Sequence, residues 1–171
     1  RTHPVTVNRI AETRERAASL PRPEVDDAAG YSLTKARIRV LSSPTPQKAL
    51  EFFLGEQQDP KSIGNLGTDY GIALVRMQLG EYGAARDLFR NLRTAHPGVI
   101  PFHTGLANAE LALGNKAPAF LIYDQAMTLF PRNVPLTVHY AEALLANGNP
   151  GKAHSILLDL LNNVPPTAQQ V

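Results

Sequence analysis

Apolar residues recur at steps of three and four along most of the chain, and this spacing places them on one face of an α-helix. One such stripe combines Ala29, Leu33, Ala36 and Val40. Short segments rich in proline and glycine separate the stripes, and these residues end helices. The pattern predicts an all-α fold with helices near residues 7–20, 28–41, 46–54, 68–79, 83–95, 101–113, 116–130, 135–147 and 150–162.

Five kinds of position recur at a spacing of 34 residues between residues 66 and 167. This period divides the region into three units, 66–99, 100–133 and 134–167. The recurring positions are a glycine (Gly80, Gly114, Gly148), two alanines (Ala73, Ala107, Ala141 and Ala85, Ala119, Ala153), a bulky residue (Phe89, Tyr123, Leu157) and a proline (Pro97, Pro131, Pro165).

Each recurring residue type has a physical role in a pair of helices. Glycine ends the first helix because it adopts the left-handed conformation at little cost. Alanine lets two crossing backbones approach closely, and the bulky residue fills the space between one unit and the next. Proline ends the second helix because it lacks an amide donor. The units are therefore predicted to stack as antiparallel helix pairs in a curved solenoid.

A 34-residue unit with this order of small, small, bulky and proline positions resembles the tetratricopeptide repeat (TPR). The resemblance implies a right-handed α-α superhelix whose concave face is lined mainly by the first helix of each unit. By register it places nine residues on or near that face: Tyr70, Leu74, Met77, Thr104, Asn108, Leu111, Val138, Glu142 and Leu145.

The groove implied by these nine residues is largely apolar and suits an extended or helical apolar peptide. Some TPR proteins bind acidic C-terminal tails through Lys or Arg at several of these places, but here they are Tyr70, Thr104 and Val138. A clamp of that kind is therefore disfavoured. The alternative is that the nine residues face a neighbouring helix of the intact protein.

The segments outside the three units are less regular. Residues 1–24 are expected to form a junction segment with one helix, and residues 25–65 a degenerate helix pair without the glycine and small-residue columns. The stretch Gly55–Gly67 is expected to be a loop and the least ordered interior part. Residues 168–171 resemble the start of a further, truncated element, so we expect the intact protein to continue beyond Val171.

Composition narrows the class of protein. The 171 residues are 43% hydrophobic and 19% charged, which is typical of a globular chain. The net charge is +2 and no basic run stands out, so nucleic acid is not an expected partner. There is no cysteine, and no run of 18 apolar residues predicts a membrane span.

Motifs for catalysis are missing from the sequence. It contains no HExxH, no P-loop and no GxSxG, so we expect these residues to be non-catalytic and to hold no cofactor. His139 and Glu142 are three residues apart on one predicted helix face, but no third metal ligand is near, which favours a surface pair. His96 is expected at a helix C-terminus. His103 and His154 are expected to pack or lie on the surface.

A second resemblance lies at the N-terminus. The string Thr2-His3-Pro4-Val5-Thr6-Val7-Asn8-Arg9-Ile10, and the charged helix after it, resemble a junction in bacterial zinc metallopeptidases of the M48 family that carry C-terminal TPRs. In those proteins this segment closes the catalytic domain. The start of the first unit, Tyr70-Gly71-x-Ala73-Leu74, also resembles theirs.

This resemblance implies a function that the repeats alone do not. The intact protein would be an exported, periplasmic zinc endopeptidase in envelope protein quality control, with zinc held by an HExxH helix upstream of Arg1. The repeats would position substrates, such as unfolded envelope proteins, or bind outer-membrane assembly partners or the protein's own catalytic domain. His3 would lie near the zinc, or it is an ordinary linker histidine. The alternative function is a free-standing scaffold that assembles other proteins.

Overall fold

The computed structural model describes residues 28–59 and 65–163. Across these residues the chain forms eight α-helices and no strand, which confirms the predicted all-α fold class. The helices are α2 (Ala28–Ser42), α3 (Pro46–Gln58), α4 (Leu66–Gln78), α5 (Tyr82–Ala95), α6 (Ile100–Ala112), α7 (Lys116–Leu129), α8 (Val134–Ala146) and α9 (Pro150–Asn163).

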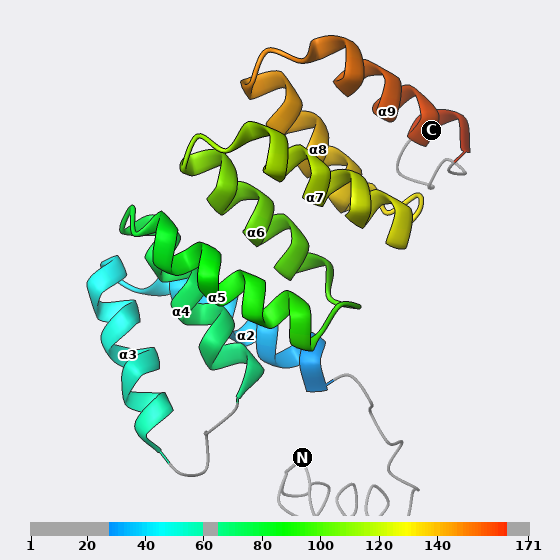
Figure 1. Ribbon diagram of the computed structural model, residues 1–171. Coiled ribbons are helices and arrows are strands. Elements are labelled where there is room, and N and C mark those ends of the chain that lie inside the picture. Colours follow the sequence, from blue (N-terminus) through cyan, green and yellow to red (C-terminus); the bar gives the residue numbers. More distant parts are fainter. Residues whose placement is uncertain (1–27, 60–64, 164–171) are drawn as a thin grey trace, which may run out of the picture.

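From α4 onward the helices form antiparallel pairs, α4 with α5, α6 with α7, and α8 with α9. The pairs stack in sequence order, so that the chain builds a helical-repeat solenoid (Figure 1). We call the side formed by α4, α6 and α8 the first-helix face. The predicted boundaries of these six helices agree with the structure to within two residues.

The three repeated glycines adopt the predicted left-handed conformation, with φ of +75° at Gly80, +83° at Gly114 and +78° at Gly148. After each glycine the next residue donates its amide hydrogen back to a carbonyl five positions earlier. An example is the 2.9 Å bond from Glu81 N to Arg76 O. This is a Schellman cap, which satisfies carbonyls at a helix C-terminus. The glycines therefore end the first helices in the way that the repeat predicted.

The alanine columns lie in the core, as predicted, and all six of their side chains are buried. Phe89 and Tyr123 of the bulky column are fully buried, whereas Leu157 on the last helix is only partly buried. A β-carbon at Gly71 would clash with the ring of Phe53, and one at Gly105 would clash with the ring of Phe89. Each ring thus packs directly against a backbone of the following helix.

Helix α3 corrects the prediction that the small-residue column is absent before the first unit. Ala49 and Phe53 are buried and four residues apart, like Ala85 and Phe89 in the first unit. Their offset from that pair is 36 residues rather than 34. The column is present, and two additional residues lie between it and the first unit.

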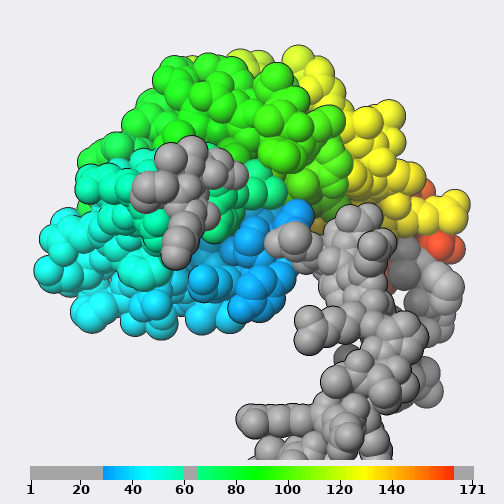
Figure 2. Space-filling model, turned by 90° about the horizontal axis from the view of Figure 1, so that it is seen from below, coloured from blue at the N-terminus to red at the C-terminus, as the bar shows by residue number. Residues whose placement is uncertain are grey.

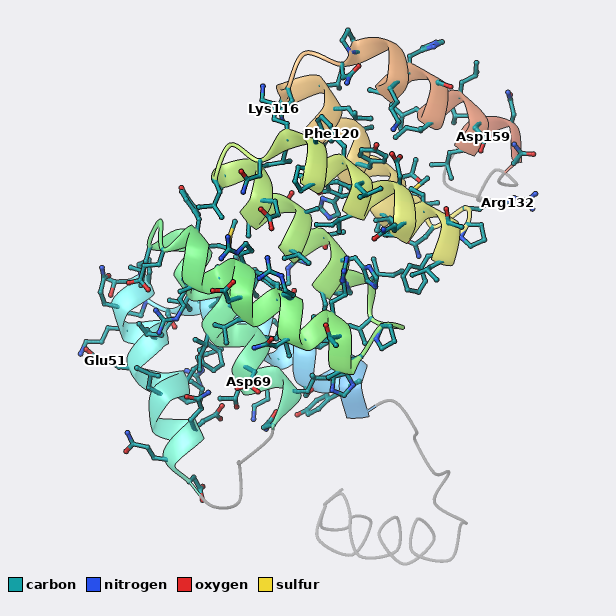
Figure 3. The ribbon with its side chains drawn as sticks, viewed as in Figure 1. Glu51, Asp69, Lys116, Phe120, Arg132 and Asp159 are labelled. Atoms are coloured by element: carbon teal, nitrogen blue, oxygen red, sulfur yellow. The ribbon has the colours of Figure 1, made fainter. Side chains whose placement is uncertain are left out.

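The predicted loop at Gly55–Gly67 is shorter than expected. Helix α3 continues to Gln58 and α4 begins at Leu66, while residues 60–64 are not described. The last turn of α3 is joined to the first turn of α4 by hydrogen bonds: Gln57 Nε2 donates to Asp69 Oδ1 at 2.9 Å, and Thr68 Oγ1 donates to Glu56 Oε2 at 2.9 Å. These bonds stabilise the last turn of α3 and the first turn of α4, on either side of residues 60–64. Asp69 is labelled in Figure 3.

Helix α2 does not form the predicted pair with α3. It packs extensively along α4 and touches α3 only slightly. Gly67 allows this, because a β-carbon there would lie 2.7 Å from the carbonyl oxygen of Ser32. Leu33, Ala36 and Val40 form the buried stripe of α2. In the view from below, α2 (blue) lies beside α3 (cyan) on the surface (Figure 2).

Several predictions concern residues that the structure does not describe. These are the helix near residues 7–20, the position of His3, the closing Pro165 and the element beginning at residues 168–171.

Candidate binding groove

A hollow of about 280 Å³ opens on the first-helix face, between α2 and the first helices of the three units. Three of its walls come from α2, α4 and α6, and α8 contributes His139. Five of the nine predicted groove residues line it: Tyr70, Leu74, Met77, Thr104 and Asn108.

The other four predicted residues do not line this hollow. Leu111 is partly buried against the core, and Val138 and Leu145 on α8 are 39% and 55% exposed. Glu142 is exposed, and its Oε2 atom lies 3.5 Å from Nδ1 of His139. The two residues therefore share one helix face, as predicted. The exposed surface of α8 is mixed, with the apolar Val138 and Leu145 and the charged Glu142.

Equivalent positions on this face become more exposed from the first unit to the third. Tyr70 is 4% exposed, Thr104 is half-buried and Val138 is exposed, although these residues are 34 positions apart. Leu74 is half-buried, whereas its equivalents Asn108 and Glu142 are exposed. The cause is α2, which lies along α4 and covers the first unit.

Tyr70 belongs to the core as much as to the hollow. Its ring makes an edge contact with Phe89 at a centroid distance of 6.2 Å and a tilted contact with Phe102 at 5.7 Å. Burial raises the pKa of the Tyr70 hydroxyl, and the nearby positive charge of Arg37 partly offsets this rise. Replacing Tyr70 would therefore disturb packing as well as the groove.

Asn108 is fixed by the second helix of its own unit. The Tyr123 hydroxyl donates a 2.7 Å hydrogen bond to Asn108 Oδ1. The Asn108 amide nitrogen remains able to donate, and the residue is exposed on the first-helix face. Side-chain amides in this setting bind the carbonyl groups of peptides.

The sequence reasoning missed the wall of the hollow formed by Arg37, Val40 and Leu41 of α2. Val40 was recognised as part of an apolar stripe, but the partner of that stripe was taken to be α3. The sequence contained one indication that α2 presents positive charge: it carries Lys35, Arg37 and Arg39 and contains no Asp or Glu.

Two other hollows lie away from the predicted groove. One, of about 590 Å³, separates α2 from α3, where the guanidinium of Arg39 lies 4.2 Å from the centre of the Phe52 ring. The other, of about 520 Å³, lies over the C-terminal ends of α5 and α7 and includes His103.

His103 is buried, and its Nε2 atom lies 2.8 Å from the carbonyl oxygen of Pro97. Because a carbonyl only accepts, Nε2 carries the hydrogen in this contact. Burial lowers the pKa of His103; the bond to Pro97 opposes this shift, and the charge of Arg93 adds to it. His96 is the C-cap residue of α5, as predicted, and His154 is exposed.

Within residues 28–59 and 65–163, no group of three or more His, Asp or Glu side chains is placed to hold a metal ion. No helix in that part of the chain is both long and apolar enough to cross a membrane. Comparison of the sequence with models of known protein families found no match, and comparison with curated proteins found none.

Proposed function

We propose that this chain is a non-catalytic interaction module that holds an apolar segment of a partner protein on its first-helix face. The observation that carries the proposal is the hollow lined by Leu74, Met77, Thr104 and Asn108. It combines an apolar floor with polar groups that can pair with a peptide backbone, which is the usual composition of a binding site.

The size of the hollow favours a segment of a longer partner over a small molecule. About 280 Å³ is at the lower limit of small-molecule pockets, which span roughly 300–1,000 Å³. It suits one or two side chains. Val138 and Leu145 continue the apolar surface beyond it, so the rest of the segment would lie over α8.

We further propose that the module is the substrate-positioning arm of an exported zinc endopeptidase of the periplasm. The support is the resemblance of residues 2–10 to the M48 junction and of residues 66–167 to TPRs. Zinc would belong to the catalytic domain, and the partners would be unfolded envelope proteins or outer-membrane assembly proteins. An HExxH motif encoded upstream of Arg1 in the same reading frame is expected. Its absence would leave the module as a scaffold without a protease.

The binding proposal is tested by measuring how tightly the full chain binds a fluorescein-labelled peptide composed of leucine, valine and alanine. The double variant Val138→Ser with Leu145→Ser should weaken binding about tenfold or more, since each substitution removes one apolar contact of roughly 1 kcal/mol. The control is Leu121→Ser with Leu129→Ser, because these leucines, each 58% exposed, lie on the second helix α7. Equal weakening by both pairs, or no binding by the unmodified chain, would contradict the proposal.

A further inference from the structure

The charge on the groove wall identifies the kind of segment that the groove accepts. The hollow has two ionisable side chains besides Tyr70, Arg37 on α2 and His139 on α8, and no Asp or Glu lines it among the described residues. Arg37 gives the α2 wall a positive charge, whereas His139 lies 3.5 Å from the carboxylate of Glu142 on α8. A negatively charged group of a partner is therefore favoured at Arg37.

Arg37 has no salt bridge among the described residues, a property that it shares with Arg93, Lys116 and Arg132 of the repeats, but of these four residues only Arg37 lines the hollow. Lys48, Arg76, Arg90 and Lys152 each form a salt bridge with an Asp or Glu. For Arg37 no salt bridge or side-chain hydrogen bond exists within the part of the chain that the structure describes. Since α2 contains no acid, Arg37 has no pair on its own helix either.

Apolar side chains line the hollow together with Arg37, and others are exposed on α8. Leu41, on the same wall, is 72% exposed, and Val138 and Leu145 are exposed on α8. A segment that placed a carboxylate against Arg37 would therefore have apolar surface to cover within the hollow and on α8. This arrangement fits an acidic side chain within an apolar segment better than the carboxylate at the end of a chain.

We propose that the groove selects an apolar segment with an internal Asp or Glu, whose carboxylate pairs with Arg37. The inference rests on the proposed function and specifies the partner of the same site. Arginine suits this role because its planar guanidinium binds a carboxylate through two parallel hydrogen bonds. Helix α2 thus closes the groove over the first unit and also supplies the charge that recognises the partner.

The test compares two peptides of leucine, valine and alanine, acetylated and amidated, which carry a central Glu or a central Gln. Binding to the full chain is measured by fluorescence anisotropy at neutral pH and low salt. The Glu peptide is expected to bind about three- to tenfold more tightly, the gain of a partly exposed charged pair. Salt should reduce this difference because it screens exposed charges.

Arg37→Gln should remove the preference for Glu, so that the Glu and Gln peptides bind with the same affinity. Lys35→Gln is the matched control: it removes a charge of the same helix that does not line the groove, and the preference should remain. Circular dichroism confirms that both variants fold.

Three results would overturn the inference. Equal affinity of the unmodified chain for both peptides would show that the groove does not select a carboxylate, while leaving the proposed function intact. A Gln peptide with a free C-terminus that gains affinity through Arg37 would assign the pair to a chain end. Binding of neither peptide would reject the proposed function itself.

Discussion

The junction between the first and second units differs from the junction between the second and third. In the first, the Phe89 ring on α5 packs directly on the backbone of α6 at Gly105. The ring contact is apolar, and α5 and α6 approach closely. An ion pair also spans the two helices, with Arg90 Nη2 on α5 3.3 Å from Glu110 Oε1 on α6. At the position equivalent to Gly105, 34 residues later, the third unit has His139.

The second junction uses stacked rings and charges. Tyr123 on α7 stacks on Tyr140 on α8 with ring centres 4.7 Å apart and planes inclined by 5°. The ring of Phe120, which is labelled in Figure 3, has its centre 6.3 Å from that of Tyr140. The Tyr140 hydroxyl donates to Asp124 Oδ1 at 2.8 Å, and Lys152 Nζ lies 2.9 Å from the same carboxylate. Helices α7 and α8 approach less closely than α5 and α6.

The comparison shows that one repeated column supports two kinds of contact. A bulky aromatic residue occupies position 89 and position 123, but the two rings pack differently, Phe89 on the backbone at Gly105 and Tyr123 on the ring of Tyr140. Glycine admits the ring to the backbone, whereas a larger residue leaves room only for stacking between side chains. Charged side chains bridge both junctions, Arg90 to Glu110 at the first and Lys152 and Tyr140 to Asp124 at the second, so the junctions differ in how the rings pack.

The largest loss of stability is expected when the aromatic ring at the first junction is removed. Phe89 is fully buried, so Phe89→Ala should lower the free energy of unfolding by about 3–5 kcal/mol. Leu157→Ala, at the equivalent but only partly buried position on α9, should cost less. Urea unfolding measures both. Equal losses would contradict the view that Phe89 holds a junction between units.

A smaller effect is expected when the glycine is changed instead of the ring. Gly105→Ala adds a β-carbon that clashes with Phe89, and overpacking of this kind costs about 1–3 kcal/mol. Gly83→Ala on α5 is the control, because its added β-carbon meets no atom within 4 Å. If thermal unfolding finds Gly105→Ala as stable as Gly83→Ala, the ring does not pack on this backbone.

Removing the hydroxyl of Tyr123 and adding a hydroxyl to Phe89 should each lower the free energy of unfolding. Tyr123→Phe removes the bond to Asn108 and should cost about 0.5–1.5 kcal/mol. Phe89→Tyr buries a hydroxyl at the apolar junction, and an unpaired buried hydroxyl costs about 1–3 kcal/mol. Chemical denaturation of the two variants compares these effects. A stabilised Phe89→Tyr variant would show that the first junction offers a polar partner.

Acid should weaken the first junction more than the second. This is the smallest of the four losses of stability that we expect. His103 lies beside the first junction, and its equivalent in the third unit is Thr137, which does not titrate. Because the folded-state pKa of His103 is below its ordinary value of 6.5, the unfolded chain binds a proton that the folded chain does not. The stability from neutral His103 is present above pH 6.5 and is lost as the pH falls towards the lowered pKa.

The control for this pH effect is His103→Gln, which keeps an amide donor for Pro97 and does not titrate. Melting temperatures are measured between pH 8 and pH 5. The unmodified chain should lose more stability on acidification than the Gln variant. The same loss in both would assign the acid sensitivity to other groups.

Much of the fold could be predicted because helix-ending glycines, buried alanines and the bulky column recur at one fixed spacing. Ala49 and Phe53 were missed because their offset from the first unit is 36 residues, and a strict period excludes them. The position of α2 depends on a backbone contact between Gly67 and Ser32, which no period reveals.

The groove was predicted less completely than the fold. Register identified Leu74, Met77, Thr104 and Asn108, because residues on the same side of the first helices share a face. It did not reveal that Tyr70 would be covered or that Arg37 would form a wall, since both depend on where α2 packs. Positions that are equivalent in the sequences of the three units therefore differ in how far their side chains are exposed.

The most direct test of the central claim maps where an apolar segment binds. Amide chemical shifts of the full chain are recorded by NMR during titration with the leucine, valine and alanine peptide. Changes are predicted at Leu74, Thr104, Asn108, Val138 and Leu145 on the first-helix face, and only small ones on α5, α7 and α9. Changes that gather on the second helices, or none at all, would contradict the account.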